Sequence, residues 1–342
     1  MKITMLGTTG SGKTVYMSAM AELFFHGNMD GYSIGNRNTG YESDAFVYRG
    51  FDEGNTLYQS GRFPSGTSSS LVMPLELRFR GTRILDIDWI DYRGGAIKEL
   101  ALGVDDPENA EIFAALIASD VVLVFVDAAV LKVCENKFAA RAMVGANEIS
   151  QLLSMVSRKK RIDVLFLLSK ADSSIINIAK DLPMFQERID MLYGKFFSDT
   201  NTSITQYNII PVAACGYGNV QTTYKWESDG KGGQQLIFDN KVTNFAGVNP
   251  VNVASSFAMA LLKCLDRELK RLHTDAASLA RELEALEKNF GPVKNLIDML
   301  FYKSKKREHI HDLKSIILES RGDIRALSPH RPWLDRIISG NR

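Results

Sequence analysis

Residues 7–14 combine glycines, a lysine and a threonine in the order G-x-x-x-x-G-K-T, a spacing that suits phosphate binding. A short apolar run precedes them, and a helical pattern begins near Val15. Glycines let the backbone curl so that successive N–H groups point at phosphate oxygens, and the following helix adds its positive end. A chance glycine-rich turn explains less of this pattern, so we interpret it as a nucleotide-phosphate loop.

The residues of this loop have separate expected roles. Lys13 reaches the β- and γ-phosphates of a nucleoside triphosphate, and the Thr14 hydroxyl is a ligand for Mg²⁺. The residues expected to contact the nucleotide here are Gly7, Thr9, Gly10, Ser11, Gly12, Lys13, Thr14 and Val15.

A second chemical motif, Asp91-Tyr92-Arg93-Gly94, follows the apolar strand pattern at 83–90. A carboxylate at a strand end can hold Mg²⁺ through its water shell, and a glycine three residues later can offer its N–H to a γ-phosphate. D-x-x-G is a weak signal by itself, and its place after a phosphate loop strengthens it. Asp91 and Gly94 are therefore candidate catalytic residues, and Asp91 is also a candidate metal ligand.

A third motif, Ser169-Lys170-Ala171-Asp172, follows the buried strand pattern at 164–168. A carboxylate here can accept hydrogen bonds from the ring N–H and the exocyclic amine of guanine, while the lysine stem lies over the base. Adenine lacks this donor pair, so Asp172 would discriminate strongly between the two bases. The alternative is a solvated loop at the end of a strand. Small residues at Ala213, Ala214 and Cys215 follow the last strand pattern and allow their backbone to close over the base.

Strand and helix patterns alternate around these motifs. Strands are expected at 3–6, 71–80, 83–90, 121–126, 164–168 and 204–213, and helices at 13–25, 42–60, 107–119, 139–157 and 184–197. The tight turn Gly81-Thr82 joins 71–80, an expected edge strand half in water, to 83–90 as an antiparallel hairpin. This order predicts an α/β three-layer fold whose six-stranded sheet is mostly parallel, with one antiparallel edge strand. The ligand should then lie beyond the carboxyl ends of the strands.

Composition excludes several classes of protein. The chain has 342 residues and a formal net charge of +1, so no global field directs it to nucleic acid or membrane. Three scattered cysteines without metal-ligand spacing favour a reduced, cytoplasmic setting. The apolar run after Lys2 is too short for a signal peptide, and the apolar stretch at 121–126 is too short to span a bilayer. Peripheral attachment to a membrane stays open.

The C-terminal third is helical in pattern. Apolar residues from Leu262 to Phe290 alternate steps of three and four, Gly291-Pro292 ends the pattern, and a second helix follows. We expect an antiparallel helical hairpin whose seams close on each other, or whose seam binds a protein partner or a second copy. The basic run Lys303-Ser304-Lys305-Lys306-Arg307 would suit nucleic acid or an anionic membrane, but we favour an ordinary solvated helix face.

The series of motifs resembles that of Ras-like, translation-factor-class GTPases over about residues 1–215. The segment ending in Arg62-Phe63-Pro64-Ser65-Gly66-Thr67 also looks like the switch region of bacterial double-GTPase-type proteins of conflict and defence gene clusters. The resemblance implies a P-loop NTPase fold and GTP, GDP and Mg²⁺ as ligands. It also implies that Thr67 is a switch threonine that ligates Mg²⁺ and senses the γ-phosphate. An ordinary Ser/Thr loop at 65–70 is the alternative.

Three positions depart from the pattern of that family. Gly95 replaces the glutamine that orients the attacking water in many Ras-like enzymes. Hydrolysis would then be slow or need another group, from Arg93, Glu99 or a partner, although a solvated surface is the simpler interpretation of both side chains. Ser169 replaces the usual Asn or Thr, and Ala213-Ala214 replaces Ser-Ala.

These expectations combine into one leading hypothesis with two rivals. Residues 1–265 would form a GTPase domain with a long switch insertion at 27–66 and a second insertion at 216–247. We expect the second insertion to form a hairpin whose aromatic residues pack in a core; the alternatives are that they flank the base or contact a partner. Residues 266–342 would form the helical extension. The leading hypothesis is a GTP-hydrolysing switch that signals through its loops and helical tail. The rivals are an ATPase on the same loop and a non-hydrolysing, nucleotide-stabilised assembly module.

Overall fold

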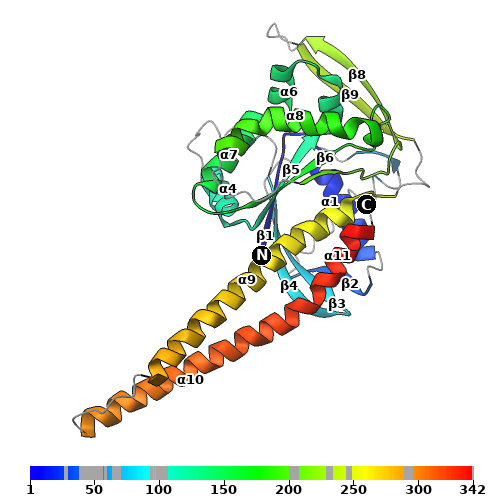
Figure 1. Cartoon of the computed structure of the whole chain (residues 1–342). Helices are drawn as coiled ribbons and strands as arrows, with labels where there is room; N and C mark the ends of the chain where they lie inside the picture. Colours follow the sequence, from blue (N-terminus) through cyan, green and yellow to red (C-terminus); the bar gives the residue numbers. More distant parts are fainter. Residues whose placement is uncertain are drawn as a thin grey trace. The chain divides into compact units, whose positions relative to one another are not determined.

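Seven strands form one mixed sheet in the computed structural model of the chain (Figure 1). The structure describes residues 1–26, 30–37, 57, 60–63, 71–92, 95, 97, 107–199, 208–228, 234–243, 249–288 and 296–340. The helix expected at 42–60 lies almost wholly outside these residues. The chain divides into two compact units: Met1–Ala260 with Ile337–Arg342, and Leu261–Arg336. The domain boundary predicted at residue 265 stays a prediction.

The strand order is β2-β3-β4-β1-β5-β6-β7. β3 runs antiparallel to both of its neighbours, and β4, β1, β5, β6 and β7 are all parallel. The strands are β1 (Lys2–Leu6), β2 (Tyr32–Asn36), β3 (Leu71–Phe79), β4 (Thr82–Asp91), β5 (Val121–Asp127), β6 (Asp163–Ser169) and β7 (Asn208–Pro211). The predicted α/β class, the mostly parallel sheet and the β3–β4 hairpin are confirmed.

The edge of the sheet differs from the prediction. β2 is a seventh strand that pairs with β3, so β3 is not the edge. Its five residues include Gly35 and follow Gly31, a composition typical of a loop, and only Tyr32 and Ile34 are buried. Pairing with a longer neighbour, rather than local propensity, makes this segment a strand.

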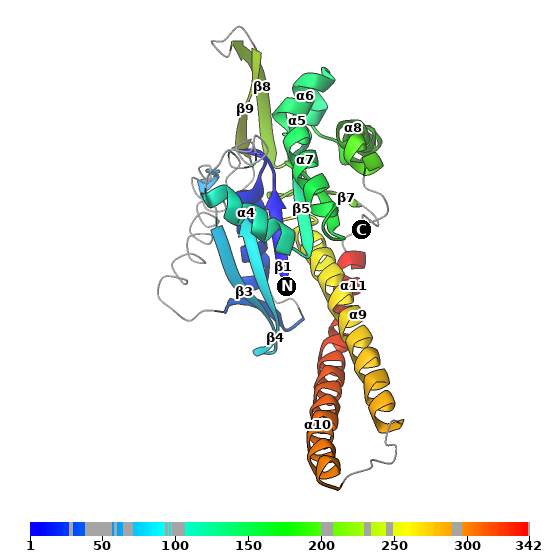
Figure 2. The ribbon, with the colours of Figure 1, turned by 90° about the vertical axis from the view of Figure 1, so that its left-hand side faces the viewer.

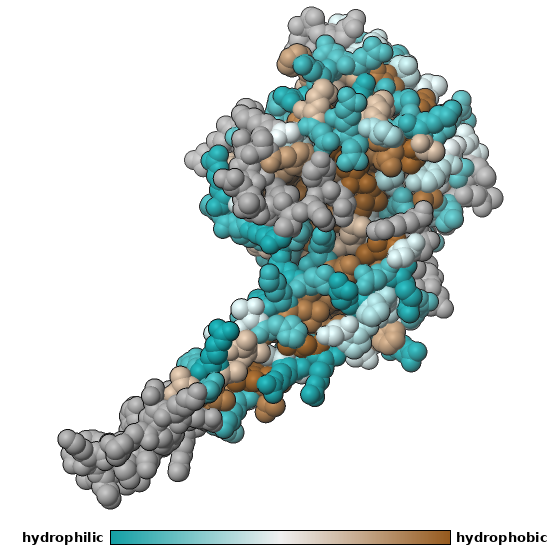
Figure 3. Space-filling model, in the orientation of Figure 1, coloured by the Kyte–Doolittle hydropathy of each residue, from teal (hydrophilic) through white to brown (hydrophobic). Residues whose placement is uncertain are grey.

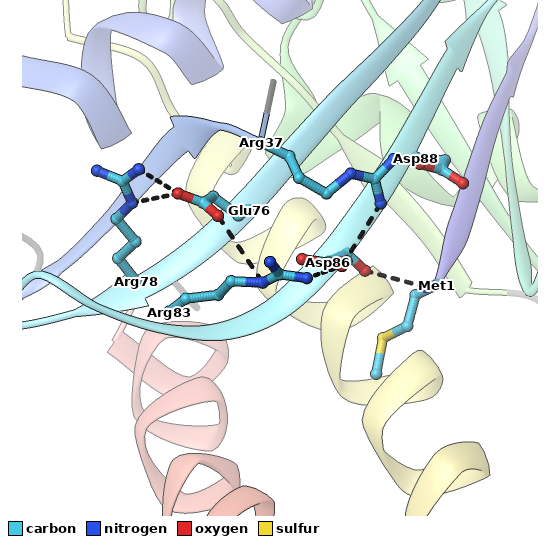
Figure 4. A network of polar contacts seen from close by, with 7 residues as sticks. All are labelled: Met1, Arg37, Glu76, Arg78, Arg83, Asp86 and Asp88. Atoms are coloured by element: carbon cyan, nitrogen blue, oxygen red, sulfur yellow. Dashed lines mark hydrogen bonds and ion pairs between the residues drawn. The ribbon is translucent and has the colours of Figure 1, made fainter. Parts of the chain in front are cut away.

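Polar residues of β3, the strand expected to be a solvated edge, form an ionic network with polar residues of β4 instead (Figure 4). Glu76 is only 6% exposed and pairs with Arg78 and Arg83. Arg37, just beyond β2, lies 2.7 Å from Asp88 and 3.6 Å from Asp86. Partly exposed pairs contribute about 0–1 kcal/mol each. The network therefore mainly satisfies charges. It consists of Met1, Arg37, Glu76, Arg78, Arg83, Asp86 and Asp88.

Helices cover both faces of the sheet (Figures 1 and 2). On one face, apolar residues of β5 and β6 form a core with α4 (Pro107–Ala118), α7 (Ala146–Ser157) and α8 (Ile178–Asp199). The opposite face carries α1 (Lys13–Ala21), the π-helical turn η1 (Glu22–His26) and the first turns of α9 (Val253–Lys288).

Aromatic rings hold this second face together. The ring centroids of Tyr16 and Phe125 are 5.2 Å apart, and Phe257 of α9 lies 4.9 Å from Phe24 and 5.5 Å from Trp89. Such pairs add about 0.5–1.5 kcal/mol each beyond their burial. They fix α1, and with it the loop that precedes α1, against the sheet.

The helix predicted at 139–157 is two helices. α5 (Ala128–Val133) and α6 (Lys137–Met143) precede α7, and Gly145 separates α6 from α7 with a φ of 64°. A side chain at Gly145 would place its Cβ 2.7 Å from Thr8 Cγ2. Close contact with the phosphate loop therefore interrupts an otherwise continuous helical pattern, a constraint that no local pattern reports.

The insertion after β7 contains the predicted hairpin, β8 (Val220–Ser228) and β9 (Gln234–Val242). Its expected aromatic core is wrong, because Tyr224 and Trp226 are 49% and 42% exposed. Burial is concentrated at the base of the hairpin, where Val220, Thr222 and Val242 are each at most 5% exposed. The base of the hairpin, and not its outer part, is thus the packed region.

The second unit contains the later part of α9, then α10 (Leu296–Leu327), η2 (Ser328–His330) and most of α11 (Arg331–Gly340). α10 runs back beside the later part of α9 (Figure 2). Hydrophobic side chains gather along the line between them (Figure 3). The predicted C-terminal helices are confirmed. The buried seam residues include Leu265, Leu272, Leu313, Ile317 and Leu327. Among the described residues, no helix is both long enough and apolar enough to cross a bilayer.

Candidate nucleotide-binding site

A pocket of about 390 Å³ lies at the carboxyl ends of β1, β5 and β6. Four segments distant in the sequence line it: residues 9–16, residues 169–173 with the exception of 171, Val212 with Ala214, and Val220 with Asn240 of the hairpin. Phe63 and Phe125 complete the wall. The predicted phosphate motif and the predicted base motif thus share one cavity of the size expected for a small ligand.

Backbone geometry shapes the phosphate end of this pocket. Gly10 and Gly12 have φ values of 74° and 91°, which glycine adopts without strain. A Cβ at Gly7 would lie 2.5 Å from Ser11 Oγ, so the loop also needs glycine there for space. Ser11 is 2% exposed, and its Oγ has no hydrogen-bond partner within the described residues. A buried hydroxyl of this kind lining the pocket fits a bound phosphate.

Lys13 opens α1 and lies across its own loop. Its Nζ donates to the carbonyl oxygens of Gly7, at 2.8 Å, and Thr8, at 3.3 Å. Burial lowers the pKa of Lys13, and the negative charge of Asp91 opposes that shift. A buried ammonium held by neutral carbonyls is poorly compensated for its lost hydration. A phosphate oxygen would supply a negative partner in direct contact with Nζ.

The residues proposed to hold Mg²⁺ lie near this lysine. Asp91 ends β4, is 2% exposed, and pairs in register with Met5 of β1. Thr14 lines the pocket. A carboxylate and a hydroxyl are hard oxygen donors that suit Mg²⁺, which usually takes its remaining ligands from water and phosphate. The described residues contain no group of three or more His, Cys, Asp or Glu side chains placed to hold a metal, and such a site does not require one.

Three of the predicted catalytic residues, Thr67, Arg93 and Gly94, lie outside the described residues. Their expected roles therefore stay predictions. Gly95, the departure from the family pattern, is described and exposed.

At the base end, the third motif is held by backbone and charge contacts. Lys170 has a φ of 58°, and its Nζ lies 2.5 Å from Asp127 Oδ2. Asp172 is 5% exposed, and its Oδ2 accepts a hydrogen bond of 2.9 Å from Cys215 N. Ser169 directs its hydroxyl to the carbonyl oxygen of Val126, at 3.2 Å. The motif is thus ordered by contacts that leave it facing the pocket.

Burial raises the pKa of Asp172 above its ordinary value of 3.8, while the hydrogen bond from Cys215 and the charge of Lys170 act in the opposite direction. A carboxylate in this setting gains from any donor pair that approaches it. The ring N–H and amine of guanine form such a pair.

The three small residues after β7 are placed differently from one another. Ala214 lines the pocket, whereas Ala213 and Cys215 are fully buried and do not line it. Cys215 instead positions Asp172 through its backbone N–H. Gly7, likewise, shapes the phosphate loop without lining the cavity.

Sequence reasoning missed the contribution of the hairpin. Val220 N donates to the carbonyl oxygen of Asp172, at 3.1 Å, and Ser174 N donates to that of Val220, at 2.7 Å. The aromatic residues of the insertion are its most conspicuous feature in the sequence, but the pocket-lining residues of β8 and β9 are Val220 and Asn240. No motif marks either position, so only the fold could identify them.

A glycine-rich loop joins a buried strand to a helix, and a buried carboxylate lies at the far end of the same pocket. This geometry defines a phosphate-loop nucleotide-binding protein. The chain belongs to the Double-GTPase 2 family, whose model matches residues 2–212. The expected likeness to double-GTPase-type proteins is thereby confirmed, and membership implies a GTP-binding domain. A search among curated proteins found no match.

Proposed function

We propose that the protein binds GTP with Mg²⁺, hydrolyses it slowly to GDP, and acts as a switch. The observation that carries this proposal is Asp172. Its buried carboxylate shares one pocket with the phosphate loop and is held in place by Cys215 N. Guanine can add two donors to this acceptor, whereas adenine lacks that donor pair, so guanine is favoured over adenine.

The residues of the phosphate end would divide the remaining work. Backbone N–H groups of the loop hold the phosphate oxygens, and Lys13 exchanges its carbonyl partners for the β- and γ-phosphates. Thr14, Asp91 and Thr67 would hold Mg²⁺, which neutralises charge on the β- and γ-phosphates when bound. Gly94 would donate its N–H to the γ-phosphate. The loops that carry Thr67 and Gly94 would rearrange when that phosphate leaves.

Slow turnover follows from Gly95. Without a side chain at that position, the chain has no glutamine to orient water, and Arg93 or a partner would supply the missing group. An added arginine raises such rates by roughly 10³–10⁵. Single-turnover release of phosphate from bound GTP tests this step, and we expect Gly95→Gln to change the rate. An unchanged rate would contradict the proposed register of the switch.

The helical unit, Leu261–Arg336, is the proposed site for a protein partner or a second copy. The exposed side chains of Ile316 and Leu318 offer surface for such contact. Light scattering of the full chain with GTP and with GDP tests the link to nucleotide state. A cytoplasmic setting, favoured by three free buried cysteines, and a role in bacterial defence are part of the same proposal.

A non-hydrolysing assembly module is the second candidate, and Gly95 is the observation that favours it. Tight GTP binding without phosphate release over hours would support it over the switch. The ATPase alternative is tested separately by calorimetry with GTP and ATP. Equal affinity for both nucleotides would overturn the guanine site.

A further inference from the structure

We propose that Asn240 is a second specificity residue of the base pocket and that it donates a hydrogen bond to the 6-oxo edge of the purine. The inference rests on the proposed guanine site and extends it to a residue on the inserted hairpin. Asn240 lies on β9, at about 70 residues from Asp172 in the sequence, and lines the same cavity.

The hairpin is tied to the base motif at its foot. Ser173 Oγ donates to Thr222 Oγ1 at 2.7 Å, and Thr222 N donates to Ser174 Oγ at 3.1 Å. Together with the backbone bonds of Val220 described above, these contacts hold β8 beside residues 172–174. Asn240, which pairs with Thr222 across the hairpin, is therefore carried by the same framework as Asp172.

A chain of hydroxyl groups sets the orientation of the Asn240 amide. The Thr222 hydroxyl accepts a hydrogen bond from Ser173 and donates its single proton to Asn240 Oδ1, at 2.8 Å. The carbonyl oxygen of the amide is thereby used, and the NH₂ group is left to donate. Within the described residues, Nδ2 makes no hydrogen bond. The Asn240 NH₂ group is thus available to donate to a ligand in the cavity that Asn240 lines.

The chemistry of guanine supplies the matching acceptors. Asp172 accepts from the ring N–H and the 2-amino group, which leaves O6 and N7 on the other edge of the base. Both of those atoms are acceptors, whereas adenine places an amino donor at position 6. An amide NH₂ group therefore favours a 6-oxo purine and opposes a 6-amino purine. Asn240 and Asp172 would read different edges of one base.

Ser169 lines the same pocket and does not supply this donor. Its hydroxyl proton is directed to the carbonyl oxygen of Val126, at 3.2 Å. Ser169 thus offers no amide to the base. Asn240 brings an amide into the same pocket from a different element.

The test combines a mutation of Asn240 with a nucleotide that is altered at O6 of the base. Asn240→Leu keeps the size of the side chain and removes its donors. We expect its affinity for GTP to fall about tenfold, the usual effect of losing one hydrogen bond in a pocket. Its affinity for 6-thioguanosine triphosphate, which keeps the ring N–H and the 2-amino group and replaces O6 by a weakly accepting sulfur, should change much less. Equal losses for both nucleotides, or no loss for GTP, would overturn the proposal.

Two controls separate this proposal from folding defects and from the guanine site itself. Gln221→Leu makes the same kind of change on the exposed side of β8 and should leave both affinities unchanged. Thr222→Val should lower GTP affinity by removing the orienting hydroxyl, whereas Thr222→Ser should restore it. If wild type prefers GTP and loses that preference in Asp172→Asn while Asn240→Leu has no effect, only the role of Asn240 fails. If wild type binds ATP equally well, the proposed function fails.

Discussion

The two ends of the pocket are built in different ways. The phosphate loop is one stretch of eight residues, shaped by its own backbone and crossed by Lys13, and Asp91 of β4 lies near that lysine. The base end is assembled from residues 169–173, the turn at 213–215 and the hairpin, which come together only in the folded chain. The phosphate loop is thus local in sequence, whereas the base end depends on tertiary contacts.

This difference explains why a sequence motif can predict the phosphate loop but not the whole base end. A backbone cradle constrains the sequence directly, because glycine is needed at Gly10 and Gly12 for conformation and at Gly7 for space. Side chains that read a base can come from any element that reaches the pocket. The insertion between β7 and α9 therefore forms part of the base end. We expect mutations in it to change nucleotide specificity more than phosphate binding.

The largest expected effect is at the phosphate end. Lys13→Ala should weaken GTP and ATP alike by at least about 30-fold, because losing one partner of a buried charged pair costs about 2–5 kcal/mol. Calorimetry with both nucleotides measures the change. Lys2→Ala, at the other end of β1, is the matched control and should bind as wild type does. A loss confined to GTP would show that the two ends are not separate.

Acid should weaken the base end before the phosphate end. Guanine needs the ionised carboxylate of Asp172, whose pKa is raised by burial, so the preference for GTP over ATP should decline as pH falls through that pKa. The decline can reach roughly tenfold for each pH unit below the pKa. Titrating the ratio of the two dissociation constants from pH 8 downward checks this, and a constant ratio in Asp172→Asn is the control.

Protonation of Asp172 should affect the stability of the nucleotide-free chain in the opposite direction: acid weakens the preference for GTP but favours the folded state. The pKa of Asp172 in the folded chain exceeds the ordinary value of 3.8, so the folded state binds more protons between these two values. Its contribution to the free energy of unfolding is therefore present at low pH and is lost as pH rises through the folded pKa. The difference in unfolding free energy between wild type and Asp172→Asn isolates it. A difference that does not vary with pH would contradict the raised pKa.

A mutation at Gly145, just before α7, should lower stability because it would crowd Thr8 of the phosphate loop. Gly145→Ala should lower the free energy of unfolding by about 1–3 kcal/mol, since a left-handed conformation costs an alanine about 1–2 kcal/mol and the new Cβ would meet Thr8. Urea unfolding measures the change. Gly194→Ala in α8, where no atom lies within 4 Å of the new Cβ, should stabilise by about 0.5–1 kcal/mol. Equal effects at the two sites would contradict the contact with Thr8.

The smallest expected effect is on the outer part of the hairpin. Trp226→Ala should change nucleotide affinity by less than about twofold, because exposed substitutions away from a site usually cost at most about 0.5 kcal/mol. Trp226 lies beyond the packed base of the hairpin and does not line the pocket. A larger loss would extend the base end to the exposed aromatic residues.

The sequence predicts the sheet and the phosphate end well because both depend on local patterns. The buried strands β5 and β6 are continuous apolar runs, and the loop after β1 has a fixed spacing. β2 could not be predicted, because its strand character comes from pairing with β3. The break at Gly145 depends on Thr8, more than a hundred residues away. Asn240 carries no signal at all outside the folded hairpin.

The most direct test of the central claim, that Asp172 selects guanine, is a change of specificity. Xanthosine triphosphate carries an oxygen where GTP carries its 2-amino group, so an asparagine amide can donate to it where the aspartate carboxylate cannot. We predict by calorimetry that Asp172→Asn loses affinity for GTP and gains affinity for xanthosine triphosphate, whereas Asp163→Asn, at the opposite end of β6, changes neither. Misfolding cannot produce the gain. If Asp172→Asn binds both nucleotides as wild type does, Asp172 does not contact the base, and the account of the site is wrong.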